Sequence, residues 1–89
     1  MKINGEFILR EVVDEHVLIP VGDTALRFSG IIGLNPVGAV IWKGLLAGKD
    51  RDALLDMILE EFEVSREEAG QDLDGFLEML RKNQLLDEA

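Results

Sequence analysis

Two short segments near the N-terminus are rich in Val, Ile and Phe, and they are separated by a charged pair. These segments are Phe7 to Val13 and His16 to Val21, with Asp14-Glu15 between them. Such β-branched and aromatic runs around a polar break predict a β-hairpin. A loop over residues 22–30 has glycine at both ends, and a third short strand is expected over residues 31–34.

The apolar positions change to helical spacing after residue 34. Asn35-Pro36 predicts a helix start, because Asn is a favoured N-cap and Pro needs no N–H partner at the first helical position. Asp50 and Ser65 are placed to cap two further helices, and Gly48 is placed to end the first one in a left-handed conformation. The third helix is expected to bury one stripe of apolar side chains: Ala69, Leu73, Phe76, Leu77 and Leu80.

Strands first and helices after predict an α+β fold. We expect a three-stranded antiparallel sheet followed by three helices, an order compatible with a small winged helix-turn-helix. A chain of 89 residues has room for one hydrophobic core, so residues 1–89 are expected to form a single domain. The sequence contains no cysteine, which fits a reducing, cytoplasmic compartment, and no apolar run approaches the ~18 residues of a membrane span.

Charge is distributed unevenly along the chain. The net charge is −9, from 18 acidic and 9 basic residues. Residues 1–49 carry five of each, so residues 50–89 carry thirteen acidic residues against four basic ones. Nucleic-acid binding needs clustered Lys and Arg to displace counterions. The charge therefore weighs against nucleic acid as a partner, and against a winged-helix DNA-binding regulator, although the predicted architecture would suit one.

A search for catalytic or metal-binding motifs finds none. His16 is the one histidine, and a base or metal ligand needs partners that it lacks in the sequence. Neither a P-loop nor a Gly-x-Gly-x-x-Gly turn is present. The acidic residues after position 49 lie at helical spacing and lack the pattern of a calcium loop, so they are interpreted as a solvated helix face. We therefore expect no enzyme activity, no metal and no cofactor.

With catalysis and metal binding set aside, a binding function remains, and the third predicted strand, over residues 31–34, is the most suitable segment for it. This strand carries no charge, and an uncharged edge strand allows an extended peptide to pair with it main chain to main chain. Ile32 and Leu34 share the face expected to join the core, whereas Ile31 and Gly33 point the other way. Gly75 in the third helix has two open interpretations: close approach of another backbone, or a tolerated substitution.

Three parts of the chain together resemble the PqqD family. The run from Gly30 to Trp42 contains Leu34-Asn35, small residues and then Ile41-Trp42. The stretch from Asp72 to Leu80 is similar to the family's Asp-aliphatic-x-x-Phe-Leu-x-x-Leu pattern, and Phe7 to Glu11 and Val17 to Gly22 are similar to its first two strands. The resemblance extends from about residue 6 to residue 87.

This resemblance implies a small winged-helix module, also called a RiPP recognition element. Such modules are non-enzymatic chaperones that bind the leader segment of a ribosomally synthesised precursor peptide and present it to a modifying enzyme, often a radical SAM enzyme. The leader docks as an extra strand along the third strand, against the third helix. Carried to this sequence, the contacts fall on Ile31, Ile32, Gly33, Asp72, Gly75, Phe76 and Met79. Some members dimerise by exchanging elements, so monomer and homodimer both stay open, and a protein–protein adaptor is the remaining alternative.

Overall fold

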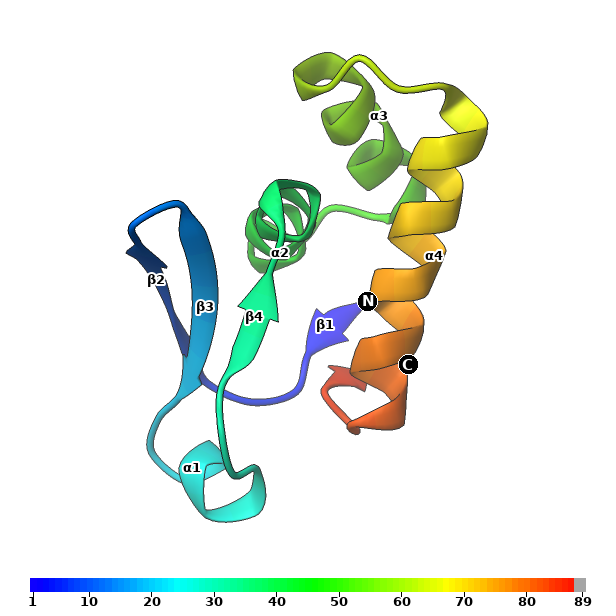
Figure 1. Ribbon diagram of the computed structural model, residues 1–89. Coiled ribbons are helices and arrows are strands. Elements are labelled where there is room, and N and C mark those ends of the chain that lie inside the picture. Colours follow the sequence, from blue (N-terminus) through cyan, green and yellow to red (C-terminus); the bar gives the residue numbers. More distant parts are fainter. Residues whose placement is uncertain (88–89) are drawn as a thin grey trace.

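The computed structural model describes residues 1–87, which form five strands and four helices (Figure 1). In chain order these are β1 (Lys2–Ile3), β2 (Phe7–Val12), β3 (Glu15–Pro20), α1 (Thr24–Arg27), β4 (Ile32–Leu34), α2 (Pro36–Leu46), α3 (Arg51–Glu61), α4 (Arg66–Lys82) and β5 (Leu86–Asp87).

The main sheet is antiparallel, with the strand order β2-β3-β4. Its central strand pairs Val17 with Arg10 on one side and with Gly33 on the other. The predicted α+β fold with a three-stranded antiparallel sheet is therefore confirmed. The hairpin turn lies at Val13 and Asp14, one residue earlier than predicted, and Val13 takes up the turn with a positive φ of 58°.

All three predicted N-caps are present in the structure. The side chains of Asn35, Asp50 and Ser65 accept hydrogen bonds from backbone N–H groups three residues later, at 2.7, 2.9 and 3.1 Å. Each cap satisfies a donor that the first helical turn leaves without a partner. Gly48 follows α2 with a φ of +80°, as its position predicted. The caps thus fix where α2, α3 and α4 begin, including the helix start that directly follows β4.

Two features differ from the sequence-based prediction. The segment 22–30 is not a plain loop but contains the single-turn helix α1, held by the buried Thr24, whose hydroxyl accepts a 2.7 Å hydrogen bond from the N–H of Glu6. The chain ends also form a second small sheet, in which β1 pairs antiparallel with β5. Figure 1 shows this small sheet beside the C-terminal part of α4.

The core lies between one face of the main sheet and the helices α2, α3 and α4. Trp42 is 1% exposed and contacts Phe7 edge-to-face, with ring centroids 5.5 Å apart. The predicted stripe of α4 is buried: Ala69, Leu73, Phe76, Leu77 and Leu80. Leu34 brings the end of β4 into the same core cluster. Of the helices in residues 1–87, none has the length and apolar character needed to cross a membrane.

Candidate functional site

One long side of β4 is unpaired within residues 1–87. The strand pairs only with β3, through Ile32, Gly33 and Leu34, and lies at the edge of the sheet. The short strand β1 does not cover this edge, because its partner is β5. Edge strands expose a row of N–H and C=O groups that can pair with another chain unless they are blocked. The edge of β4 is therefore available for strand addition.

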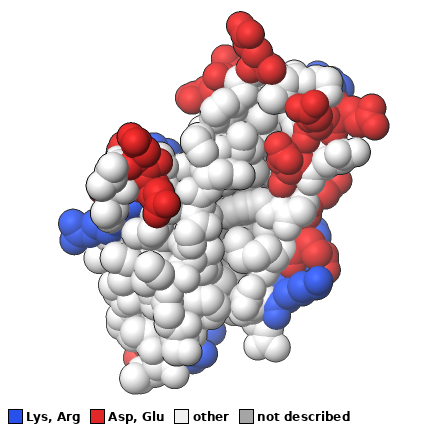
Figure 2. Space-filling view, viewed as in Figure 1, with Lys and Arg blue, Asp and Glu red and all other residues white. Residues whose placement is uncertain are grey.

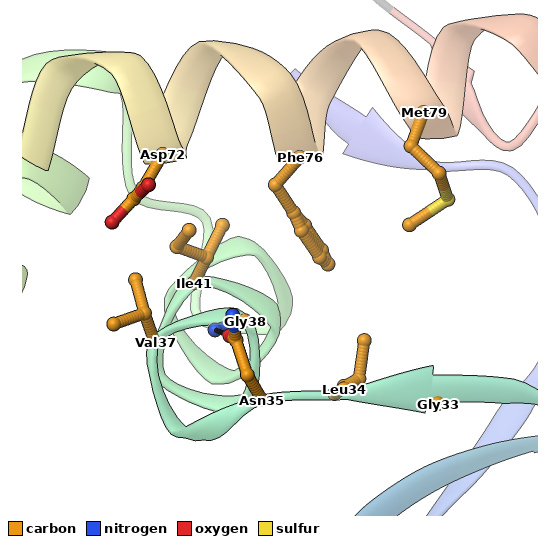
Figure 3. A pocket seen from close by; sticks show the side chains of 9 residues that line it. All are labelled: Gly33, Leu34, Asn35, Val37, Gly38, Ile41, Asp72, Phe76 and Met79. Atoms are coloured by element: carbon orange, nitrogen blue, oxygen red, sulfur yellow. Dashed lines mark hydrogen bonds between the residues drawn. The ribbon is translucent and has the colours of Figure 1, made fainter.

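The open edge faces a groove whose opposite wall is α4. This β4–α4 groove has a volume of about 200 Å³. Figure 3 shows the side chains of Phe76 and Met79 extending from α4 toward β4, with Leu34 pointing back toward Phe76, while Asp72 extends toward Val37 of α2. These three α4 residues share one face because they follow one another at spacings of four and three. The groove is thus bounded by a strand edge on one side and a helix face on the other.

The structure brings together four of the seven residues that were predicted to contact a peptide. Gly33, Asp72, Phe76 and Met79 all line the groove. The other three lie nearby but do not line it. Ile31 precedes β4 and is 62% exposed, Ile32 is half-buried against the core, and Gly75 is exposed on α4.

The floor of the groove comes from α2, which the sequence did not suggest. Val37, Gly38 and Ile41 line it together with Leu34 and Asn35. Figure 3 shows α2 nearly end-on between β4 and α4. The Asn35-Pro36 cap already placed the start of α2 next to β4, and the spacing of Val37 and Ile41 puts both on one helix face. These two local signals were the available hint that α2 contributes to the site.

A second cavity of about 350 Å³ continues from the groove around the C-terminal end of β4. It shares Gly33, Leu34 and Asn35 with the groove and adds Asp14 from the hairpin turn and Glu15 from the start of β3. Figure 2 shows acidic side chains on both sides of a hollowed, uncharged centre. The surface around the open edge is therefore apolar in the middle and negatively charged at its borders.

The groove has the chemistry of a binding surface. Its lining is mostly apolar, with one carboxylate and one amide side chain, Asp72 and Asn35. Nowhere in residues 1–87 do three or more His, Asp or Glu side chains gather as ligands for a metal ion. Trp42 lies in the core and does not line the groove, so its fluorescence is expected to report on folding more than on groove occupancy.

Comparisons with known proteins agree with this architecture. No curated protein matches the sequence. Two solved structures do match the fold. The first, described as "TbiB1 in Complex with the TbiA(beta) Leader Peptide", is 31% identical and aligns over 100% of this chain and 98% of that one, with a TM-score of 0.76. The second, described as "Lasso peptide synthetase B1 complexed with the leader peptide", is 21% identical, covers 94% of this chain and 93% of that one, and has a TM-score of 0.71.

The family model described as "Coenzyme PQQ synthesis protein D (PqqD)" matches residues 15–86. This range contains β3, β4 and the helices α1 to α4, and so every residue of the groove. The resemblance found in the sequence is therefore confirmed, and the chain belongs to the PqqD family.

Proposed function

We propose that this chain is a non-enzymatic binding protein that captures the leader segment of a ribosomally synthesised precursor peptide. The leader adds to β4 as a fourth strand and lies in the β4–α4 groove. The observation that carries this proposal is the unpaired edge of β4 facing α4 across an apolar groove. It is supported by the 31% identical TbiB1, whose solved structure is a complex with a leader peptide.

Strand addition explains how such a site gains affinity without a deep pocket. Main-chain hydrogen bonds to β4 would each contribute a net ~0.5–1.5 kcal/mol, independent of the guest's side chains. Every second side chain of an added strand points to the same face, so half of the guest's side chains face Phe76, Met79 and the floor on α2. The β4 edge would therefore give affinity for any extended peptide, and the side chains of the groove would give selectivity for particular peptide side chains.

The guest strand is expected to run antiparallel to β4. The rest of the sheet is antiparallel, and antiparallel pairs are slightly more stable per residue than parallel ones. The first residues of the bound peptide then lie beside Asn35 and near Asp72, and its last residues lie toward Ile31. We propose that Ile31, Ile32 and Gly75 border the same path, next to the four predicted residues that line the groove.

The bound leader would then be presented to a peptide-modifying enzyme. Family resemblance predicts a radical SAM enzyme for this role. We therefore propose a peptide-maturing enzyme as the partner and retain the radical SAM class as a prediction.

The test is a titration of the isotope-labelled chain with synthetic leader segments from the short reading frames beside its gene. The amide signals of Gly33 and of the groove side of α4 are expected to shift, and those of Arg10 on the opposite edge to stay in place. Methylating successive backbone nitrogens of a bound peptide should weaken binding at every second position, because alternate N–H groups of a strand face its neighbour. Shifts confined to β2, or no binding by any leader segment, would refute the proposal. Duplex DNA serves as a control that should leave the spectrum unchanged.

A further inference from the structure

Two carboxylates within one turn of α4, Asp72 and Asp74, point to different sides of the helix and differ in whether the protein itself neutralises them. Asp74 accepts two hydrogen bonds from the Arg51 guanidinium, at 2.9 and 3.0 Å, across the contact between α3 and α4. Asp72 lines the groove and has no ion-pair or hydrogen-bond partner for its side chain among residues 1–87. Its charge is thus directed into a groove whose lining is otherwise uncharged.

The negative charge at this end of the groove comes from both sides of β4. Asp14 and Glu15 line the adjoining cavity at the hairpin turn, across Asn35 from Asp72. Neither of them forms an ion pair among residues 1–87. In the last turn of α4, Arg81 is paired with Glu78 at 3.4 Å, and neither Arg81 nor Lys82 lines the groove. The unpaired negative charge that borders the site therefore lies at its Asn35 end.

We propose that the guest peptide carries a lysine or arginine in the residues that pass Asn35, at the N-terminal side of its docked segment, and that Asp72 selects it. This inference rests on the proposed function and names the chemistry of the peptide that the groove accepts. A cation there faces Asp72 and lies on the side of the site that Asp14 and Glu15 also make negative, whereas an acidic residue there is repelled. The uncharged edge of β4 cannot by itself distinguish one peptide from another, so this contact adds sequence selectivity.

The expected size of the effect is modest because these carboxylates are exposed. Exposed ion pairs contribute little, so exchanging the guest's cation for glutamine should weaken binding by roughly two- to five-fold. Salt screens such contacts, so the loss should shrink when the ionic strength rises from about 0.05 M to about 0.5 M.

A peptide selection tests this without knowledge of the natural leader. Random phage-displayed peptides are selected against the full chain, against Asp72→Lys, and against Asp56→Lys as a matched control on α3, outside the groove lining. Only peptides whose synthetic forms shift the Gly33 amide are retained. The whole chain carries a net charge of −9 and therefore attracts cationic peptides generally. For this reason, only enrichment of Lys or Arg at one fixed distance in sequence from the apolar residues of the selected peptides counts as support.

The wild type and Asp56→Lys should both enrich Lys or Arg at that distance, and Asp72→Lys should lose this enrichment, because the carboxylate that selects the cation is replaced by a like charge. Groove-binding peptides with no charge preference, or a preference that Asp72→Lys leaves unchanged, would overturn this inference alone. If no selected peptide reaches the groove, the proposed function fails together with it.

Discussion

The main sheet has two edges, and they differ in length, in charge and in what lies opposite them. The β2 edge is six residues long and carries Arg10 and Glu11, both exposed. The β4 edge is three residues long, has no charged residue and faces α4 across the groove. Charged side chains are a common device against pairing with foreign strands. The longer edge is therefore the protected one, and the shorter edge is the one suited to a guest.

Replacing Gly33 at the centre of β4 by proline should have the largest effect on peptide binding at the β4 edge. Gly33→Pro removes an N–H and puts a ring into the strand, so peptide affinity should fall by about ten-fold or more, or ~1.4 kcal/mol, in isothermal titration. Gly33→Ala is the matched control, because a Cβ at this position meets no atom within 4 Å and the N–H is retained. It should bind within about two-fold of wild type, since exposed substitutions away from special features usually change free energies by under ~0.5 kcal/mol.

Retained affinity in Gly33→Pro would mean that the guest does not pair with β4, and the contrast between the two edges would be wrong. Thermal unfolding of both variants shows whether a loss of affinity reflects a loss of folding. If the proline variant does not fold, the backbone-methylated peptides give the same information on the wild-type chain.

The glycines of α4 allow the wall opposite β4 to be tested in the same way. A Cβ at Gly75 would meet open space, and one at Gly70 would lie 3.8 Å from Nη2 of Arg51, an ordinary contact. Alanine at either position should raise the free energy of unfolding by up to ~1 kcal/mol, because glycine is a poor helix former. Nothing within the described residues requires glycine at position 75.

If a guest backbone approaches α4 closely, only Gly75→Ala should weaken binding, by roughly two- to three-fold or ~0.5 kcal/mol. Gly70→Ala, on the side of α4 near Arg51, should bind normally. Equal affinity in both variants would remove Gly75 from the site and favour the tolerated-substitution interpretation.

Local sequence chemistry predicted the features that depend on neighbouring residues. Asn35, Asp50 and Ser65 cap their helices as expected, because a cap joins residues only three positions apart. The same reasoning did not predict the β1–β5 sheet, in which Ile3 pairs with Leu86. Two-residue strands carry no periodic signal of their own, so their pairing arises only once the rest of the fold has brought the chain ends together.

The same distinction between local features and features that depend on long-range packing applies to the functional site. The uncharged strand was predicted from the pattern of residues, the α4 contacts were predicted from the resemblance to the PqqD family, and four of the seven predicted residues line the groove. The contribution of Val37 and Ile41 was missed because it depends on the angle at which α2 leaves β4, which is set by core packing around Leu34 and Trp42. Helical spacing gives the face of a helix but not its neighbour.

The smallest expected effect concerns the two α4 carboxylates and depends on pH. Hydrogen bonding to Arg51 lowers the pKa of Asp74 from its ordinary value. A carboxyl whose pKa is lower in the folded state stabilises the fold above its unfolded pKa of about 4, and this stabilisation disappears as the pH falls through the lowered value. Asp74→Asn should therefore lower the denaturation midpoint slightly at neutral pH, and its difference from wild type should vanish in acid. Asp72→Asn should cause no loss at neutral pH, because no group of the described chain pairs with Asp72. A destabilisation of equal size in both variants would show that the Asp72 carboxylate already pairs with another group of the protein. A carboxylate that is paired in this way could not select a cation on the peptide that binds to β4.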